Sequence, residues 1–156
     1  HTFITMRIDY CNALLIGSRQ NLLSKLQPIQ NASARLLTGT HKREHITPIL
    51  FALHWLPVQQ RVKFKVLVLV FKCIHGLAPR YLCELIHPYT TSSALRSHDK
   101  TLLNVPFTRS DKVRNCAFSV AGPILFNSLP HDIRCAKSTD SFKAKLKTHL
   151  FIDYFQ

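Results

Sequence analysis

The sequence predicts a mainly α protein, an irregular helical bundle with at most one short extended or β segment near residues 101–108. Apolar side chains recur every three to four residues in several stretches, which is the period of an amphipathic helix. Proline and glycine stand at the ends of most of those stretches, where helices begin and stop. In addition, 46% of the 156 residues are hydrophobic, which is enough for a real core and argues against disorder of the whole chain.

The first forty residues predict two helices. Residues 3–16 carry apolar side chains at helical spacing, and Gly17 offers a left-handed stop. A second helix is expected from a Ser18 cap to Gly39, with its apolar side chains on one stripe. Pro28 interrupts that stripe, and because proline removes a backbone donor we expect a kink or a break there.

The middle of the chain predicts three more helices. Thr47-Pro48 opens a short one, which Leu56-Pro57 closes. Val58 to Ile74 is the most hydrophobic stretch; its alternation fits a strand, whereas its length before Gly76 fits a buried helix better, and we predict a helix. Pro79 to Ile86 is expected to form a further short helix.

A polar link, Thr90 to Ser93, is the best internal boundary. Together with the loop after the second helix, it divides the chain into helical segments at residues 1–40, 45–90 and 91–156. The third segment starts with the extended piece near residues 101–108, which Pro106 makes suitable only for a sheet edge.

The end of the chain predicts a helix from Lys112 to Ala121, stopped by Gly122-Pro123, and a turn that starts at Pro130. Ser138 or Thr139 can cap the final helix. The apolar stripe of this helix consists of Phe142, Leu146, Leu150 and Tyr154. The residues expected in the core are Trp55, Phe64, Leu67, Phe71, Leu82, Phe118, Leu125 and Phe142.

Charge gives the strongest indication of function. The 21 Lys and Arg against 8 Asp and Glu leave a formal net charge of +13, which a folded domain tolerates most easily beside a polyanion. RNA or DNA is therefore the leading partner, and an acidic membrane surface the next. The longest apolar run, Val66 to Phe71, is far shorter than the roughly 20 residues of a membrane span. We expect no transmembrane segment.

Basic residues gather in four places along the chain. The residues predicted to bind nucleic acid are Lys42, Arg43, Arg61, Lys63, Lys65, Arg109, Lys112, Arg114, Lys143, Lys145 and Lys147. Such clusters can neutralise phosphates, although they equally suit a solvated face that keeps a domain soluble. The aromatic residues Trp55, Tyr81, Tyr89 and Phe107 could stack on bases, and each is also suited to a core.

Catalytic motifs are weak. His41 to His45 matches the H-x-x-E-H pattern of inverted zinc peptidases, yet it lies in a predicted loop. A third ligand would have to come from downstream, where acidic residues are few and Glu84 is the only glutamate. Cys73, His75 and Cys83 come nearest to a structural zinc site, but no C-x-x-C pair is present, and buried cysteines are the simpler interpretation. Four unclustered glycines exclude a phosphate loop. We therefore predict no enzyme activity, no metal and no cofactor.

Five cysteines, without a close pair or a secretion signal before them, favour reduced thiols in an intracellular setting. The chain opens at His1 directly on a helix-like stretch. We therefore expect it to be a piece of a longer polyprotein.

Many short motifs occur together in a fixed order. They are Leu53-His54-Trp55-Leu56-Pro57-Val58, His75-Gly76-Leu77-Ala78-Pro79, Asn127-Ser128-Leu129-Pro130 and the residues at 8–15, 25–27, 30–32, 34–36, 45–48, 61, 64–65, 95–97, 105–106, 117–121, 142–143 and 145–151. In this order they resemble the region that follows the polymerase palm in reverse transcriptases of non-LTR (LINE-class) retrotransposons. The resemblance covers nearly the whole chain. Three positions depart from the family pattern: Pro28 replaces a helix-compatible residue, Ile124 an arginine and Phe126 a tryptophan.

The resemblance implies that residues 1–40 are the end of the thumb, that 45–90 form a helical core segment, and that 91–156 form a carboxyl-terminal extension. The family's catalytic aspartates bind two metal ions and lie upstream of the matching region, and this chain has no adjacent aspartate pair. The implied function is a non-catalytic grip on template RNA or the RNA/DNA primer duplex, with the upstream palm and thumb as partners and the nucleus or cytoplasm as location. The alternative is a structural or protein-interaction module that does not bind nucleic acid directly.

Overall fold

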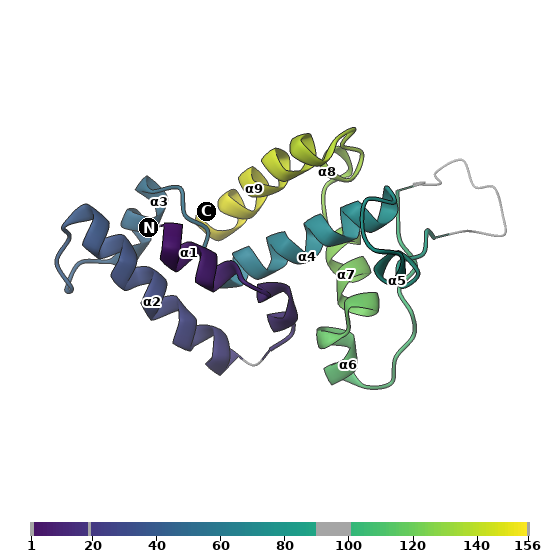
Figure 1. The fold of residues 1–156 in the computed structure, drawn as a ribbon, viewed down its shortest axis with the longest axis horizontal. Helices are drawn as coiled ribbons and strands as arrows, with labels where there is room; N and C mark the ends of the chain where they lie inside the picture. Colours follow the sequence, from purple (N-terminus) through teal and green to yellow (C-terminus); the bar gives the residue numbers. More distant parts are fainter. Residues whose placement is uncertain (1, 19, 90–100, 156) are drawn as a thin grey trace.

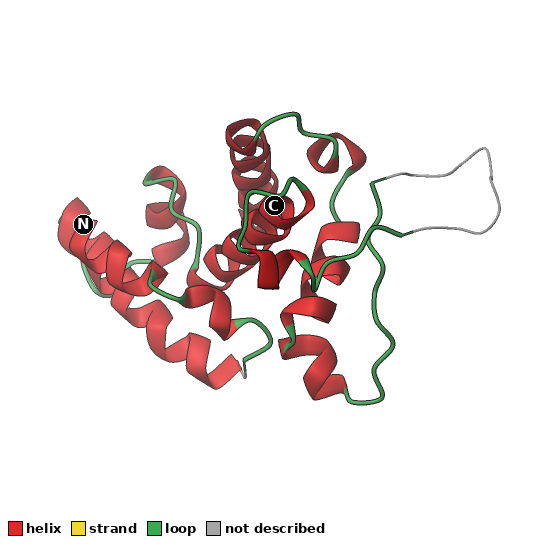
Figure 2. Cartoon of the chain, turned by 45° about the vertical axis from the view of Figure 1, so that its right-hand side comes forward, coloured by secondary structure: helices red, strands yellow, loops and turns green. Residues whose placement is uncertain are grey.

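Helices joined by short turns make up the chain in a computed structural model that describes residues 2–18, 20–89 and 101–155. Figure 2 shows helices and loops only, and within these ranges no strand is formed. The mainly α class predicted from the sequence is confirmed. The extended piece near residues 101–108 contributes a single antiparallel bridge, between Leu103 and Pro88.

One long helix, α4, is the central element, and it contacts α1, η1, α2, α5, α7 and α9 (Figure 1). The elements in chain order are α1 (Thr2–Asp9), the 3-10 helix η1 (Asn12–Leu15), α2 (Gln20–Thr38), α3 (Ile46–Ala52), α4 (Val58–Ile74), α5 (Arg80–Cys83), α6 (Asp111–Cys116), α7 (Phe118–Asn127), α8 (His131–Arg134) and α9 (Thr139–Phe155). Elements from both ends of the chain, α1 and α9, therefore pack against α4.

The helix α4 has the bounds that its sequence predicts. Its strand-like alternation arises because other elements cover several of its faces, so that Val62, Val66, Val68 and Val70 are all buried. Gly76, at φ +66°, ends the helix: the Leu77 amide donates to the Lys72 carbonyl at 2.8 Å, which satisfies a carbonyl that the helix itself leaves free.

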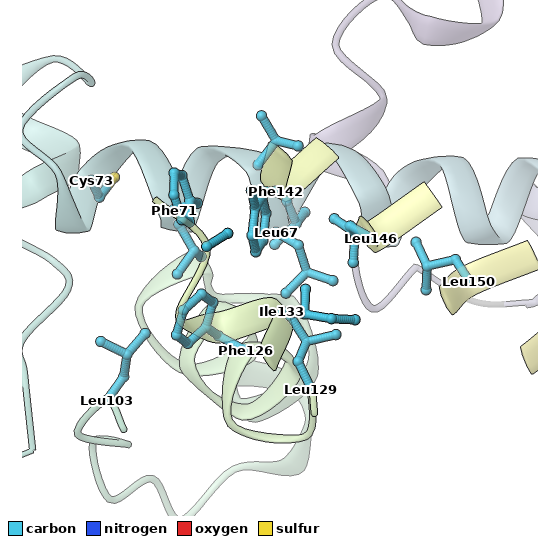
Figure 3. Close-up of a cluster of buried hydrophobic side chains, with 14 of the residues drawn as sticks. Leu67, Phe71, Cys73, Leu103, Phe126, Leu129, Ile133, Phe142, Leu146 and Leu150 are labelled. Carbon is cyan, nitrogen blue, oxygen red and sulfur yellow. The ribbon is translucent and has the colours of Figure 1, made fainter. Parts of the chain in front are cut away.

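The main core lies between α4, α7 and α9 (Figure 3). Phe142 of α9 stacks on Phe71 of α4, with ring centroids 4.2 Å apart, and its centroid lies 6.3 Å from that of Phe126 on α7. Leu67, Phe71 and Phe142 are buried as predicted, whereas Phe64, Leu82, Phe118 and Leu125 are partly buried against this cluster. Residues from both sides of positions 90–100 thus share one core. The predicted polar link Thr90 to Ser93 lies outside the described residues.

One predicted core position is wrong, and one residue of a predicted apolar stripe is exposed. Trp55 is only half-buried and is not part of the cluster; it lines a surface pocket instead. Tyr154 ends the apolar stripe of α9, but it is 45% exposed because the last turns of that helix extend past α4 toward α3. There Phe51 of α3 meets Phe151 of α9, with ring centroids 5.2 Å apart.

Two prolines expected to interrupt helices lie inside them. The helix α2 runs through Pro28 without a break, and α7 runs through Pro123. The helical stretch predicted from Lys112 to Ala121 breaks instead at Ala117, which has ψ 126° between α6 and α7. Packing outweighs the local cost of proline here, because α2 is held against α3 and α4, and α7 lies closely against α4 at Gly122.

Several predicted helix ends need correction. Cys11 adopts φ 52°, so the stretch expected from residue 3 to 16 divides into α1 and η1 before Gly17. The helix α3 begins at Ile46 with His45 as its cap, not at Thr47-Pro48, and α5 stops at Cys83, short of Ile86. These ends are set by backbone geometry that residue type does not fix.

Other predicted ends are confirmed. The helix α8 starts directly after Pro130, as predicted. At the start of α9, the Ser138 hydroxyl accepts a hydrogen bond from the Ser141 amide at 3.2 Å, so Ser138 is the cap. Among the helices that the structure describes, none combines the length and the apolar character needed to cross a membrane.

Two glutamines of α2 hold the turn that leads into α4. The Gln27 side-chain oxygen accepts a hydrogen bond from the Val58 amide at 2.9 Å, and the Gln30 side-chain amide donates one to the Leu56 carbonyl at 2.9 Å. The first amides of a helix have no partner within the helix, so Gln27 satisfies one of them. The turn between α3 and α4, which carries Trp55, is thereby fixed to the rest of the molecule.

An asparagine fixes the extended piece in a similar way. The Asn127 side chain accepts a hydrogen bond from the Leu103 amide at 2.9 Å and donates one to the Leu103 carbonyl at 2.8 Å. One side chain thus pairs with the backbone as a neighbouring strand would. This pairing, with the bridge to Pro88, accounts for an extended Leu103 in a molecule otherwise built from helices.

Candidate nucleic-acid interface

The predicted nucleic-acid-binding residues occupy four separate places in the fold. Lys42 and Arg43 lie in the turn between α2 and α3; Arg61, Lys63 and Lys65 lie on α4; Arg109, Lys112 and Arg114 lie at and just before α6; and Lys143, Lys145 and Lys147 lie on α9. Most are exposed, while Arg61, Lys63 and Lys143 are half-buried. The turn after α2 and the helix α6 lie well apart in Figure 1. The basic residues of the turn after α2 and those of α6 therefore do not form one surface.

Helical geometry also divides the clusters themselves. Residues two apart on a helix point about 200° apart, whereas residues four apart share a face. Arg61 and Lys65 therefore share one face of α4, and Lys63 points elsewhere. On α9, Lys147 shares a face with Lys143, while Lys145 points to α8 and donates to the Asp132 carbonyl at 3.0 Å.

Arg61 is turned inward. Its Nε donates to Asp9 Oδ1 at 2.8 Å and a terminal nitrogen pairs with Asp9 Oδ2, so the guanidinium grips the carboxylate through two bonds. The two side chains are only 19% and 31% exposed. Asn12 completes the group, since its side-chain amide donates to Asp9 Oδ1 at 3.2 Å. Arg61 thus links α4 to α1, and its guanidinium is engaged by Asp9 rather than available to a phosphate.

Two other predicted residues form local surface pairs. Lys143 lies 3.2 Å from Asp140, and Arg114 lies 3.7 Å from Asp111, each three residues away on its own helix. Both acidic partners are about nine-tenths exposed. Exposed pairs of this kind contribute little to stability and are screened by salt, so both cations can still meet a phosphate.

The fold joins two lysines that the sequence places in separate clusters. Lys65 of α4 and Lys147 of α9 both line a pocket of about 400 Å³ at the start of α4. Neither forms an ion pair with any carboxylate in the described part of the chain. Only tertiary packing of α9 on α4 brings these two lysines together, so no local sequence signal could have shown it.

Trp55 and Phe64 line the same pocket. Trp55 owes its position to the end of α3, where His54 adopts φ 53° and the amides of His54 and Trp55 donate to Phe51 and Leu50 at 3.0 and 2.9 Å. This is the two-bond helix ending that usually has glycine in place of His54. The His54 ring in turn stacks on Phe151 of α9, with centroids 5.6 Å apart.

Asn12 is a buried polar residue in the pocket wall that the sequence did not indicate. It lines the pocket and is 2% exposed, and its side-chain oxygen is buried with no hydrogen-bond partner. A buried polar atom without a partner is uncommon and calls for an explanation.

The weaker motifs remain apart from this pocket. His41, Glu44 and His45 lie exposed in the turn before α3, as their loop-like context predicts. In the described ranges, no three histidine, cysteine or acidic side chains come together in a way that could hold a metal ion. Cys73 is buried; burial, followed by the neighbouring Cys83 thiol, raises the pKa of the Cys73 thiol from 9.0 to about 11. The exposed cysteines are Cys11, Cys116 and Cys135.

No protein-family model, curated protein or solved structure matches this chain. The resemblance to LINE-class reverse transcriptases therefore depends on the sequence motifs alone.

Proposed function

We propose that this chain is a non-catalytic carboxyl-terminal part of a retrotransposon reverse transcriptase and helps to bind template RNA or the RNA/DNA primer duplex through its phosphates. The observation that carries the proposal is the charge: 21 Lys and Arg against 8 Asp and Glu, in a chain with 46% hydrophobic residues and a buried core. Such an excess of positive charge is the electrostatic signature of a nucleic-acid partner.

The exposure of the basic residues supports the proposal. Of the predicted contacts, Lys42, Arg43, Lys65, Arg109, Lys112, Arg114, Lys145 and Lys147 are exposed. Phosphate contacts of Lys and Arg need exposed cations and carry no sequence information, so binding is expected to be nearly independent of base sequence. We leave Arg61 out of the contact set, because its guanidinium is engaged by Asp9.

Single alanine variants test the proposal. Lys42→Ala, Arg43→Ala, Lys65→Ala and Lys147→Ala are each expected to weaken binding to unrelated RNA sequences by about the same factor. Each is also expected to reduce the magnitude of the salt slope by roughly one unit, as the loss of one phosphate contact does. Fluorescence anisotropy with labelled single strands and RNA/DNA duplexes measures both quantities. If none of the four substitutions changes the affinity for RNA, the proposal is refuted.

A second candidate, a protein-interaction module, has its own support in the structure. Phe3 and Met6 on α1 and Tyr10 just after it are at least two-thirds exposed. On α2, Leu22, Ile29 and Leu36 recur every seven residues with at least half of their surface exposed. Apolar side chains gathered in this way are typical of interaction surfaces. In this case Leu22→Lys and Ile29→Lys would abolish association with a partner such as the upstream polymerase segments, and nucleic-acid affinity would be absent or independent of salt.

A further inference from the structure

The pocket at the start of α4 has aromatic side chains in its wall, which the proposed phosphate contacts do not explain. Its walls come from α1 and η1, from the turn between α3 and α4, from α4 itself and from α9. Its volume of about 400 Å³ lies within the range of small-ligand sites. Figure 1 shows α1, α3 and the end of α9 gathered around this end of α4.

The pocket combines flat rings with positive charge at one place. Trp55 and Phe64 supply ring surfaces, on which bases stack regardless of their identity. Lys65 and Lys147 stand at the same pocket from two helices, where they can meet phosphates that flank a stacked base. The acidic Asp9 in its wall is neutralised by Arg61, so it does not repel an anionic strand.

Asn12 belongs to the wall of the pocket, but its side chain is closed off from solvent. A carboxylate can only accept, so the Asn12 atom that faces Asp9 must be the amide nitrogen, and the oxygen is the atom that remains. That oxygen is buried and has no partner. Because that oxygen is closed off from solvent, a base in the pocket is not expected to contact it, and stacking alone gives no preference for one base.

We infer that this pocket receives one unpaired base of a nucleic-acid strand, stacked on Trp55, while the neighbouring phosphates lie against Lys65 and Lys147. The inference rests on the proposed function and adds to it a site for the base, in a single-stranded stretch rather than in a duplex. A free nucleotide has the same chemistry, so the test must separate the two sources.

Trp55 is the only tryptophan, so its fluorescence reports on this pocket alone. The whole chain is titrated with a labelled single-stranded RNA, with a strand of equal length that lacks bases, and with a nucleoside monophosphate. Strand binding is followed by anisotropy and the pocket by Trp55 emission. We expect the RNA to quench Trp55, and we expect the abasic strand to bind about tenfold more weakly without quenching, because a stacked base contributes about that much.

Two variants provide the controls. Trp55→Leu is expected to remove the affinity difference between the RNA and the abasic strand. The matched change Lys112→Ala, on α6, is expected to weaken both strands equally and to preserve that difference.

Three outcomes would overturn the inference. If both strands bind equally and leave Trp55 emission unchanged, the pocket holds no base, whereas the proposed function stands. If only the monophosphate quenches and no strand binds, the pocket is a nucleotide site and the proposed function fails. If nothing binds, both fail.

Discussion

At the scale of single residues, the structure separates charges that hold the fold together from charges that are free to meet a partner. Arg61 belongs to the first group, because its guanidinium grips Asp9 through two bonds at a half-buried position. We expect Arg61→Ala to lower the free energy of unfolding by about 2 kcal/mol, since the carboxylate loses charged hydrogen bonds. It should leave the salt slope of RNA binding unchanged.

Arg80→Ala is the matched control. Arg80 also pairs with a carboxylate, Glu84 at 2.8 Å, but its side chain is 92% exposed. Denaturant unfolding should show little change for this variant. Equal effects of the two substitutions would mean that the contact between Arg61 and Asp9 does not support the fold.

The Cys73 thiol gives a prediction about pH. Its pKa is raised from 9.0 to about 11, chiefly by burial, so the folded state keeps the thiol neutral after the unfolded chain has begun to lose the proton. The stability that this thiol contributes is complete below pH 9.0 and is lost as the pH rises to about 11.

Cys73→Ala isolates this effect, because other groups that titrate in the same range are common to both proteins. The difference in unfolding free energy between wild type and variant should shrink by about 2 kcal/mol across that interval. A difference that stays constant over the interval would show that the Cys73 thiol titrates normally in the folded protein.

At the scale of elements, the sequence predicts structure well where local pattern and packing agree. The bounds of α4 follow from Pro57 at its start and Gly76 after its end, and the cap of α9 follows from Ser138. Prediction of a helix end fails where contact with another element, rather than the local sequence, determines where the helix stops. Gly122-Pro123 reads as a helix stop, yet α7 continues through it, because the missing side chain of Gly122 lets α7 approach α4.

That close approach can be tested by substitution. A Cβ atom at residue 122 would lie 2.8 Å from Cγ2 of Val70, which is fully buried and has a stiff, branched side chain. Crowding of this kind costs about 1–3 kcal/mol, and the better helix propensity of alanine offsets about 1 kcal/mol of it. We therefore expect Gly122→Ala to lower the free energy of unfolding by about 1 kcal/mol.

The double variant Gly122→Ala, Val70→Ala should lose less stability than the sum of the two single variants, because the smaller alanine side chain at position 70 makes room. Unfolding measurements on the three variants give the coupling. Additive losses, or a stabilising Gly122→Ala, would show that α7 does not press on α4 at this point.

At the scale of the whole molecule, composition predicts the kind of partner, whereas only the fold indicates a site. The charge of +13 and the basic clusters are visible in the sequence. The sequence does not show that Lys65, Lys147 and Trp55 line one pocket. Their proximity depends on how α9 packs on α4 and on the left-handed backbone conformation of His54. Helical spacing could have shown that Lys63 and Lys145 point away from their neighbours. The engagement of Arg61 by Asp9 required the structure.

The most direct test of phosphate binding is the salt dependence of RNA affinity for the unmodified chain. Each phosphate neutralised contributes about −0.9 to the slope of log K against log salt for a duplex and about −0.7 for a single strand. Contacts by Lys42, Arg43, Lys65 and Lys147 alone account for a slope of roughly −3, and each further contact, such as that of Lys112, makes the slope steeper. The slope is expected to be nearly the same for unrelated sequences. A slope near zero, or no affinity at low salt, would contradict phosphate-mediated binding and leave the interaction module as the better description.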